Sequence, residues 1–364
     1  MLFGKIACAT VALSVAVIAS AGLARAADLP VKAAKPVKDL PFFFVIDDRV
    51  TYSWMPKGTD PGAFSVQPNG SINGTTAKSV YSFTHFDAWA YGTNFFTISL
   101  FKSDHNDPAG PCLGAPTSTV TLTFPGNSFC AGASEVYGLI RSTFGWNEVF
   151  GTKMFTVGPL HNISFEVGAD AEAENTFLAP AKRDFVAGLQ FAFDLPYKGY
   201  INVAPLAYKE INHNAFDSCG VFTPGIPGVN CLGDGNTNFH TTWAVEINYY
   251  MDLGFLPDNM QYFAISGRAG FYGPKGDSNA PLNTNTPSKT ELNSEPIRLT
   301  FDASKAFLGP KYSQFVTTWV AYRYWQNKFG LDHNGAVGVC TLASGQSTNS
   351  CTESTVYAGV TVKF

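Results

Sequence analysis

The chain ends in Ser354-Thr355-Val356-Tyr357-Ala358-Gly359-Val360-Thr361-Val362-Lys363-Phe364, a stretch in which apolar and polar residues alternate. One face is apolar and consists of Val356, Ala358, Val360, Val362 and Phe364, whereas Thr355, Gly359, Thr361 and Lys363 dominate the other. A period of two is typical of a β-strand that lies between two different environments. About ten residues is also the length at which a tilted strand crosses a bilayer. The stretch therefore predicts a membrane-spanning strand.

The N-terminus predicts export. Met1 to Lys5 form a basic start, Ile6 to Leu23 an apolar region, and Ala24-Arg25-Ala26 a small-x-small cleavage site. This order is typical of a secretory signal peptide, which we assign to residues 1–26. The alternative, an anchoring helix, needs roughly 20 apolar residues and does not end in a cleavage site. Residues 27–41 contain Ala, Lys and Pro without a period, so we expect a flexible periplasmic tail there.

A signal peptide combined with a final aromatic residue on an apolar face resembles the ends of bacterial outer-membrane β-barrels. From Phe42 onward, aromatic-rich runs with a period of two alternate with turn-rich breaks. We expect twelve strands, near 42–55, 79–91, 95–102, 134–145, 161–174, 183–195, 199–211, 238–254, 261–272, 294–304, 313–328 and 354–364. An even number suits a closed bacterial barrel. The sequence thus predicts an all-β fold in which residues 42–364 form a transmembrane antiparallel barrel of the outer membrane, with both termini periplasmic.

The breaks between these runs alternate in length. Gly92-Thr93-Asn94, Pro196-Tyr197-Lys198 and Pro257-Asp258-Asn259 are tight, whereas the breaks at 57–78, 103–133, 212–237, 273–293 and 329–353 are long. Short periplasmic turns and long external loops are the expected asymmetry. The break at 146–160 is an exception, because it is long where a short turn is expected.

Six cysteines remain after the signal peptide, and they form three close pairs: Cys112 with Cys130, Cys219 with Cys231, and Cys340 with Cys351. Each pair lies in a long break after an odd-numbered strand, so all three fall on the external side. Exported proteins retain disulfides. Six cysteines allow 15 connectivities, and the spacing favours pairing within each loop. A metal site would need four ligands at a different spacing, so we expect neither metal nor cofactor.

Charge excludes one class of partner. Without Lys5 and Arg25 the 24 basic residues become 22, against 28 acidic residues, which gives a net charge of −6. No basic cluster is present, so we expect no nucleic acid partner. The expected partners are outer-membrane lipid and a small polar solute.

No catalytic motif is present, so we expect no enzyme. His85 with Asp87 is the nearest candidate pair, and we interpret it as two polar residues that face a wet lumen. His105, His213 and His333 recur before the three cysteine pairs. They could converge as a metal or anion site, but His, Asp and Asn also bond local backbone at strand ends, which we favour.

Charged residues on the predicted strands are expected to point inward, because a charge facing lipid near the midplane costs about 2–4 kcal/mol for Arg or Lys. These pore-lining candidates are Asp47, Arg49, Asp87, Glu135, Arg141, Glu166, Asp170, Glu246, Arg298, Asp302 and Arg323. One interpretation is a set of ion pairs that plugs a small barrel. The other, which we favour, is a polar channel, because twelve strands enclose more space than side chains fill at about eight strands.

Several segments resemble the nucleoside-specific (Tsx-like) outer-membrane channels. They are Glu135-Val136-Tyr137-Gly138-Leu139, Arg183-Asp184-Phe185-Val186-Ala187-Gly188, Phe191-Ala192-Phe193-Asp194-Leu195-Pro196 and Tyr208-Lys209-Glu210-Ile211-Asn212-His213-Asn214. The resemblance covers residues 79–364 and implies a narrow, monomeric channel that passes nucleosides along aromatic and ionisable side chains. Three disulfide loops depart from that pattern. We therefore expect a passive channel for small polar solutes, nucleosides above all, with a structural or adhesive barrel with a plugged lumen as the alternative.

Overall fold

The computed structural model describes residues 42–66, 69–104, 107, 132–176, 178, 180–220, 222–223, 225–278 and 286–364. The predicted signal peptide and periplasmic tail, together with His105, Cys112 and Cys130, lie outside these residues. No helix within the described ranges is both long and apolar enough to span a membrane.

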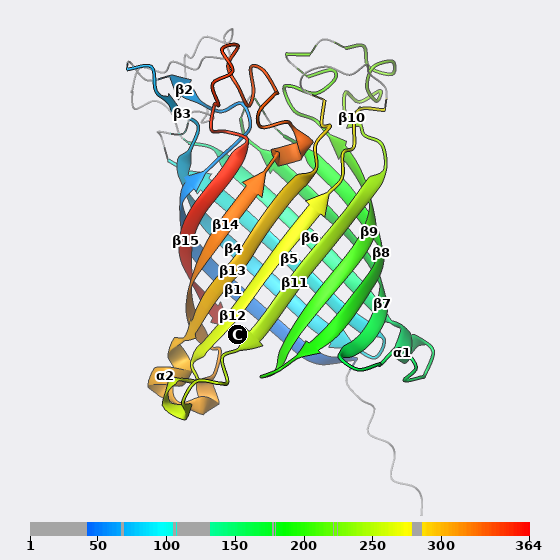
Figure 1. Ribbon diagram of the computed structural model, residues 1–364, viewed down its shortest axis with the longest axis vertical. Helices are drawn as coiled ribbons and strands as arrows, with labels where there is room; N and C mark the ends of the chain where they lie inside the picture. The colour runs from blue at the N-terminus through cyan, green and yellow to red at the C-terminus, as the bar shows by residue number, and fades with distance from the viewer. Residues whose placement is uncertain are drawn as a thin grey trace, which may run out of the picture. The chain divides into compact units, whose positions relative to one another are not determined.

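Twelve strands of the described chain form a closed antiparallel barrel (Figure 1). They are β1 (Phe43–Gly58), β4 (Thr76–Trp89), β5 (Gly92–Ser103), β6 (Ser134–Gly145), β7 (Leu160–Glu174), β8 (Lys182–Leu195), β9 (Gly199–Asn212), β11 (Thr242–Asp252), β12 (Phe263–Tyr272), β13 (Glu291–Asp302), β14 (Val316–Gln326) and β15 (Thr352–Lys363). Each strand pairs with the next one along the chain, and β15 pairs with β1, for example Val362 with Val50. The predicted twelve-strand barrel is confirmed.

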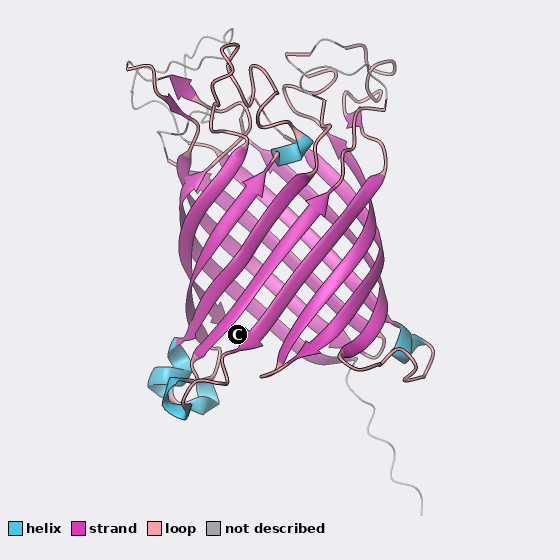
Figure 2. Cartoon of the chain, in the orientation of Figure 1, coloured by secondary structure: helices cyan, strands magenta, loops and turns pink. Residues whose placement is uncertain are grey.

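The two ends of the barrel differ, as Figure 2 shows. Long loops join the strands at one end and contain β2 (Ser65–Val66), β3 (Ile72–Asn73), β10 (Thr237–Asn238) and the 3-10 helix η3 (Lys328–Gly330). The other end, which carries both the start of β1 and the end of β15, holds α1 (Trp146–Val149), η1 (Asp258–Met260), α2 (Ala303–Leu308) and η2 (Pro310–Tyr312). Short turns mark the periplasmic end of such barrels, so the long loops are external.

The structure contains the long break predicted at 146–160 but differs from the prediction at one tight turn. The break at 146–160 contains α1, whose Phe150 N–H donates to the Trp146 carbonyl at 3.0 Å. The turn expected at 92–94 is wrong, because residues 90–91 make the turn and Gly92 already pairs with Trp89 and Phe144. A Cβ on Gly92 would lie 1.8 Å from the Thr143 carbonyl oxygen, so this close approach of two strands requires glycine.

Alternate residues of the strands expose large apolar side chains to the outside of the barrel. These residues include Val50, Tyr52, Trp54, Tyr81, Ile98, Leu100, Val136, Ile140, Val167, Phe185, Trp243, Ile297, Leu299, Val320, Val356 and Val360. A belt of this extent does not face water on soluble monomers. Together with barrel closure, it identifies the chain as an outer-membrane β-barrel surrounded by lipid.

Neighbouring positions on β6 test this assignment. Ile140 is 43% exposed on the outer face, whereas Leu139 lines the lumen. We expect Ile140→Lys to lower the free energy of unfolding by about 2–4 kcal/mol, because the ammonium would face hydrocarbon. Leu139→Lys should cost clearly less, since the new charge lies in the lumen opposite Asp170. Urea unfolding of both variants in liposomes measures the difference, and equal losses would contradict the assigned faces.

Candidate functional site in the barrel lumen

A cavity of about 1350 Å³ occupies the periplasmic part of the lumen. Its lining begins among the periplasmic turns, at Tyr197, Leu253 and Tyr262, and ends at Glu172, Lys182 and Trp325 inside the strands. No residue of the external loops, as far as they are described, contributes to the lining. The described lumen is therefore a cup that is reached from the periplasmic end.

The structure places most of the predicted pore-lining residues in this cavity. Those that line it are Asp47, Arg49, Arg141, Glu166, Asp170, Glu246, Arg298 and Asp302. Glu135 and Arg323 also point inward but lie nearer the external end, where Glu135 binds Lys78 and Arg323 binds Glu353. Both are buried, so they fill the lumen there rather than line an open path.

Asp87 is the exception, because it lies on the outer face. It pairs in register with Ile46 and Asn94, and Ile46 is 56% exposed on that face. His85 points the same way and lies 2.7 Å from Asp48 and 3.1 Å from Asp87. The predictions that Asp87 and His85 face a wet lumen are therefore wrong. The β4 run has aromatic residues on both faces, so its pattern does not determine which face is inside.

Arg141 crosses the lumen at mid-height. Its Nη1 lies 2.5 Å from Asp170 on the neighbouring strand β7, and its Nε and Nη2 donate to Glu246 at 2.9 and 2.7 Å. Glu246 belongs to β11, from which β6 is separated by β7, β8 and β9 around the wall. Tyr137 and Tyr272 donate to the same two carboxylates, at 2.8 and 3.1 Å. We call Arg141, Asp170 and Glu246 the cross-lumen bridge, and it narrows the cavity.

Beyond the bridge, buried ion pairs fill the external part of the lumen. This ion-paired plug consists of Asp60, Lys78, Glu135, Lys182, Asp184, Glu210, Lys275, Arg323, Lys328 and Glu353. Lys78 Nζ, for example, lies 2.8 Å from Asp60 and 2.9 Å from Glu135. Burial requires such pairing, because an isolated charge in this place would lose its hydration without compensation.

Four buried charged residues at the external strand ends were not predicted, and three of them belong to the plug. Lys78, Lys182 and Glu353 each lie one residue before a predicted strand start, and Glu291 begins a strand predicted to start at 294. Charged residues at these ends interrupt the apolar alternation, so the predicted strands stop short. Extending each run outward while its period of two continued would have placed these residues on the lumen face.

One acidic group within the plug has the composition of a metal site. Ligand atoms of Asp60, Glu135 and Glu174 lie within 4.8 Å of one another, and they form the one such group among the described residues. The Lys78 ammonium, however, already binds two of the three carboxylates. The arrangement is therefore that of an ion pair.

Four external loops pack over the plug. Their buried contacts, which we call the loop cap, are made by Ala63, Leu178, Ala215, Phe216, Leu331, Ala336, Val339, Cys340 and Cys351. Gly62, with φ +82°, lies against the Phe216 ring, where a Cβ would come within 2.2 Å of the ring. The cap therefore joins loops from opposite ends of the chain by direct packing.

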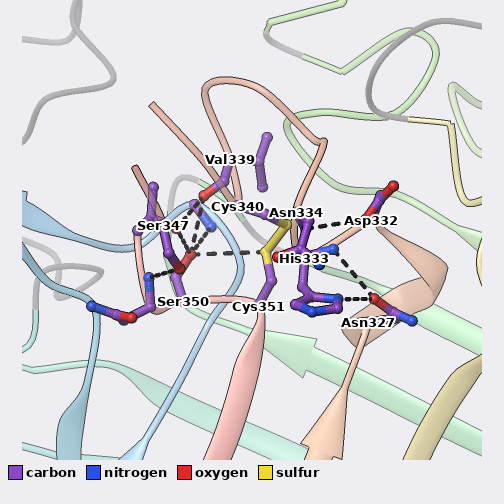
Figure 3. The surroundings of a disulfide bond; sticks show 12 residues. Asn327, Asp332, His333, Asn334, Val339, Cys340, Ser347, Ser350 and Cys351 are labelled. Carbon is purple, nitrogen blue, oxygen red and sulfur yellow. Dashed lines mark hydrogen bonds between the residues drawn. A yellow bond between two sulfur atoms is a disulfide. The ribbon is translucent and has the colours of Figure 1, made fainter. Parts of the chain in front are cut away.

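Disulfides hold the loops as predicted in two of the three cases. Cys219 is bonded to Cys231 and Cys340 to Cys351. Figure 3 shows the second bond beside Ser350, whose Oγ donates to the Val339 carbonyl at 3.1 Å and accepts from the Gly62 N–H at 3.1 Å. The predicted Cys112–Cys130 bond concerns residues outside the described ranges.

The recurring histidines make local contacts. His333 Nδ1 lies 2.6 Å from Asn327 Oδ1, and the Asn334 N–H donates to Asp332 at 3.0 Å (Figure 3). His213 Nδ1 lies 2.9 Å from the Gly235 carbonyl oxygen. For these two histidines the structure agrees with the interpretation as turn-capping residues.

Asp217 gives the loop cap a dependence on pH. It is buried in the loop between β9 and β11, where desolvation raises the pKa of its carboxyl from 3.8 to about 8. Nearby Glu210 and Asp277 raise this pKa further, whereas Lys275 and the Asn214 amide lower it. A carboxyl with a raised folded pKa contributes stability that is fully present below its unfolded pKa. That stability is lost as the pH rises toward and through about 8.

We therefore expect the external loops to be cleaved faster by protease at about pH 9 than at about pH 6, because Asp217 ionises between them. Asp217→Asn should remove most of this difference. Asp234→Asn is the matched control, since Asp234 lies exposed in the same loop. If Asp217→Asn keeps the wild-type pH dependence, another group is responsible.

Removing the cation of the cross-lumen bridge should destabilise the barrel. Arg141→Met leaves Asp170 and Glu246 without their shared partner, and breaking a buried pair costs about 3–5 kcal/mol. Arg49→Met should cost about 0–1 kcal/mol, because Arg49 is 35% exposed and Asp47 retains Lys363 at 2.6 Å. Urea unfolding in liposomes compares the two, and similar losses would show that the bridge contributes no more than a surface pair.

Comparisons with known proteins add little to these observations. No protein-family model and no curated protein matches the sequence. Among solved structures, the translocator domain of the autotransporter NalP from Neisseria meningitidis is similar, with 9% identity and a TM-score of 0.38. The match covers 88% of this chain and 89% of that one. So low a similarity carries no argument about function, and the assignment as an outer-membrane β-barrel rests on strand pairing and the apolar belt.

Proposed function

We propose that this barrel is a passive, monomeric outer-membrane channel for small polar solutes, with nucleosides as the favoured class, and not an enzyme. The observation that carries the proposal is the 1350 Å³ cavity, which is large enough for a small solute and is lined by both polar and aromatic groups. One closed chain encloses it, so no second copy is needed.

The lining supports recognition of a flat, polar solute. Tyr200 and Tyr250 line the cavity as a stacked pair, with ring centroids 6.2 Å apart at 24°. Asn202 donates to Asn248 at 3.1 Å on the same two strands. Aromatic faces stack on a base without a strong sequence preference, and amides bind hydroxyl groups. The Tsx-like resemblance points to the same solute class.

Passage to the outside requires the loop cap to open. The plug beneath it is ion-paired, so opening must give each charge a new partner in water or solute, because a buried charge left unpaired is costly. The Cys340–Cys351 bond restrains the cap, since both sulfurs lie inside its buried cluster. The filled external lumen also favours a second candidate, a structural barrel that stays plugged.

Conductance in planar bilayers separates the two candidates. A channel should give a steady conductance that added adenosine reduces, and a plugged barrel should give none. Replacing Cys340 and Cys351 by Ser should raise conductance, because the cap loses its internal cross-link. Replacing Cys219 and Cys231 by Ser is the matched control, since that bond lies outside the buried cluster of the cap. No conductance in the wild type or in either variant would overturn the channel proposal.

A further inference from the structure

We infer that Arg268 forms an anion-binding subsite on the lumen wall, so that a nucleoside carrying an anionic group such as a phosphate binds more tightly than the neutral nucleoside. The inference deepens the proposed function, because it requires that a solute enters the cavity. It rests on the position of Arg268 and on its lack of a partner.

Arg268 lies in the middle of β12 and faces the lumen. It pairs in register with Asn248 on β11 and with Glu295 on β13, and it lines the cavity. Its side chain is exposed although the strand spans the membrane, so the exposed surface belongs to the lumen. A solute in the cavity can therefore reach the guanidinium.

Most charged residues that line the cavity from the described strands are already hydrogen-bonded or ion-paired. These are Asp47, Arg49, Arg141, Glu166, Asp170, Lys182, Glu246, Asp252, Arg298 and Asp302. Arg268 has no partner among the described residues within hydrogen-bond distance. Glu295, its neighbour across the ladder, instead accepts from Arg298 at 2.7 and 3.1 Å and from Tyr357.

An unpaired guanidinium in a confined lumen favours an oxyanion. Arg presents its donors in a planar fork that matches phosphate or carboxylate in a bidentate geometry. Confinement strengthens such a pair compared with the same pair in open water. Glu246 and Glu295 attract the Arg268 guanidinium electrostatically, but neither accepts a hydrogen bond from it. Its N–H donors therefore remain available for an oxyanion.

Glu172 indicates the orientation of the solute in the cavity. It is the other acidic or basic side chain on a described strand that lines the cavity and has no hydrogen-bonded partner. It is 93% buried and lies two residues beyond Asp170 toward the external end of β7. Arg268 lies two residues from Gly270, the register partner of Glu246, on the periplasmic side. These two lining side chains without a hydrogen-bonded partner thus flank the cross-lumen bridge. A carboxyl oxygen accepts hydrogen bonds from hydroxyl or amino groups, so these groups point toward Glu172 and the anionic group belongs at Arg268.

The test compares adenosine 5′-monophosphate, adenosine and inorganic phosphate as blockers of the full-length protein in planar bilayers. We expect the monophosphate to block at a concentration about tenfold lower than adenosine, as for one charge-assisted hydrogen-bonded contact. Arg268→Gln should abolish this difference, and Arg268→Lys should restore part of it, because it keeps the charge and loses the fork. Lys153→Gln removes an exposed charge that lies outside the cavity lining, so it should leave the difference unchanged.

A second readout separates this inference from the channel proposal. Calorimetric binding of the same three probes to the detergent-solubilised barrel needs no conductance. Binding of the monophosphate or of phosphate that Arg268→Gln weakens supports the subsite even if no current flows. Equal binding of adenosine and its monophosphate to the wild type and to Arg268→Gln would overturn the subsite, even if the barrel conducts.

Discussion

The pairing of β15 with β1 is the constraint on which the rest of the structure depends. In a bilayer every backbone N–H and C=O must find a partner inside the protein, and only closure satisfies the edge strands. Residues from Arg49–Trp54 pair with Ala358–Lys363 to complete the ring. Closure then sorts every strand residue onto a lipid face or a lumen face, so the apolar belt and the charged interior are two consequences of one register.

Because of this sorting, most charged side chains of the strands lie in the lumen. The periplasmic and external halves of the lumen differ in how these side chains fill them. On the periplasmic side the walls leave a cavity that ends at the cross-lumen bridge and the residues just beyond it. On the external side buried ion pairs fill the space, and four loops seal it through apolar packing. Both disulfides of the described residues cross-link the external loops and none of the barrel strands. A conformational change in the loop cap therefore need not disturb the barrel that supports it.

Much of this architecture could be predicted from the sequence. The period of two indicates both where the strands lie and which of their side chains share a face. All twelve strands were predicted, and two disulfide pairs followed from loop spacing. The errors have physical causes. The β4 run has aromatic residues on both faces, so Asp87 was assigned to the lumen face although it lies on the outer face. Lys78, Lys182 and Glu353 interrupt the apolar alternation at the external strand ends, so the predicted strands stopped before them. The loop cap could not be predicted, because Ala63, Phe216 and Leu331 meet only after the barrel brings distant loops together. Arg268 was missed because its neighbour Gly267 lies at a β-bulge that interrupts the alternation.

The lumen is reached from the periplasm and closed outside by the loop cap. Labelling a Ser266→Cys variant with a membrane-impermeant thiol reagent tests it most directly, because Ser266 lines the cavity on the periplasmic side of the bridge. In oriented proteoliposomes we expect rapid labelling from the periplasmic face and slow labelling from the external face while the native disulfides are intact. Equally rapid labelling from the external face would contradict this arrangement.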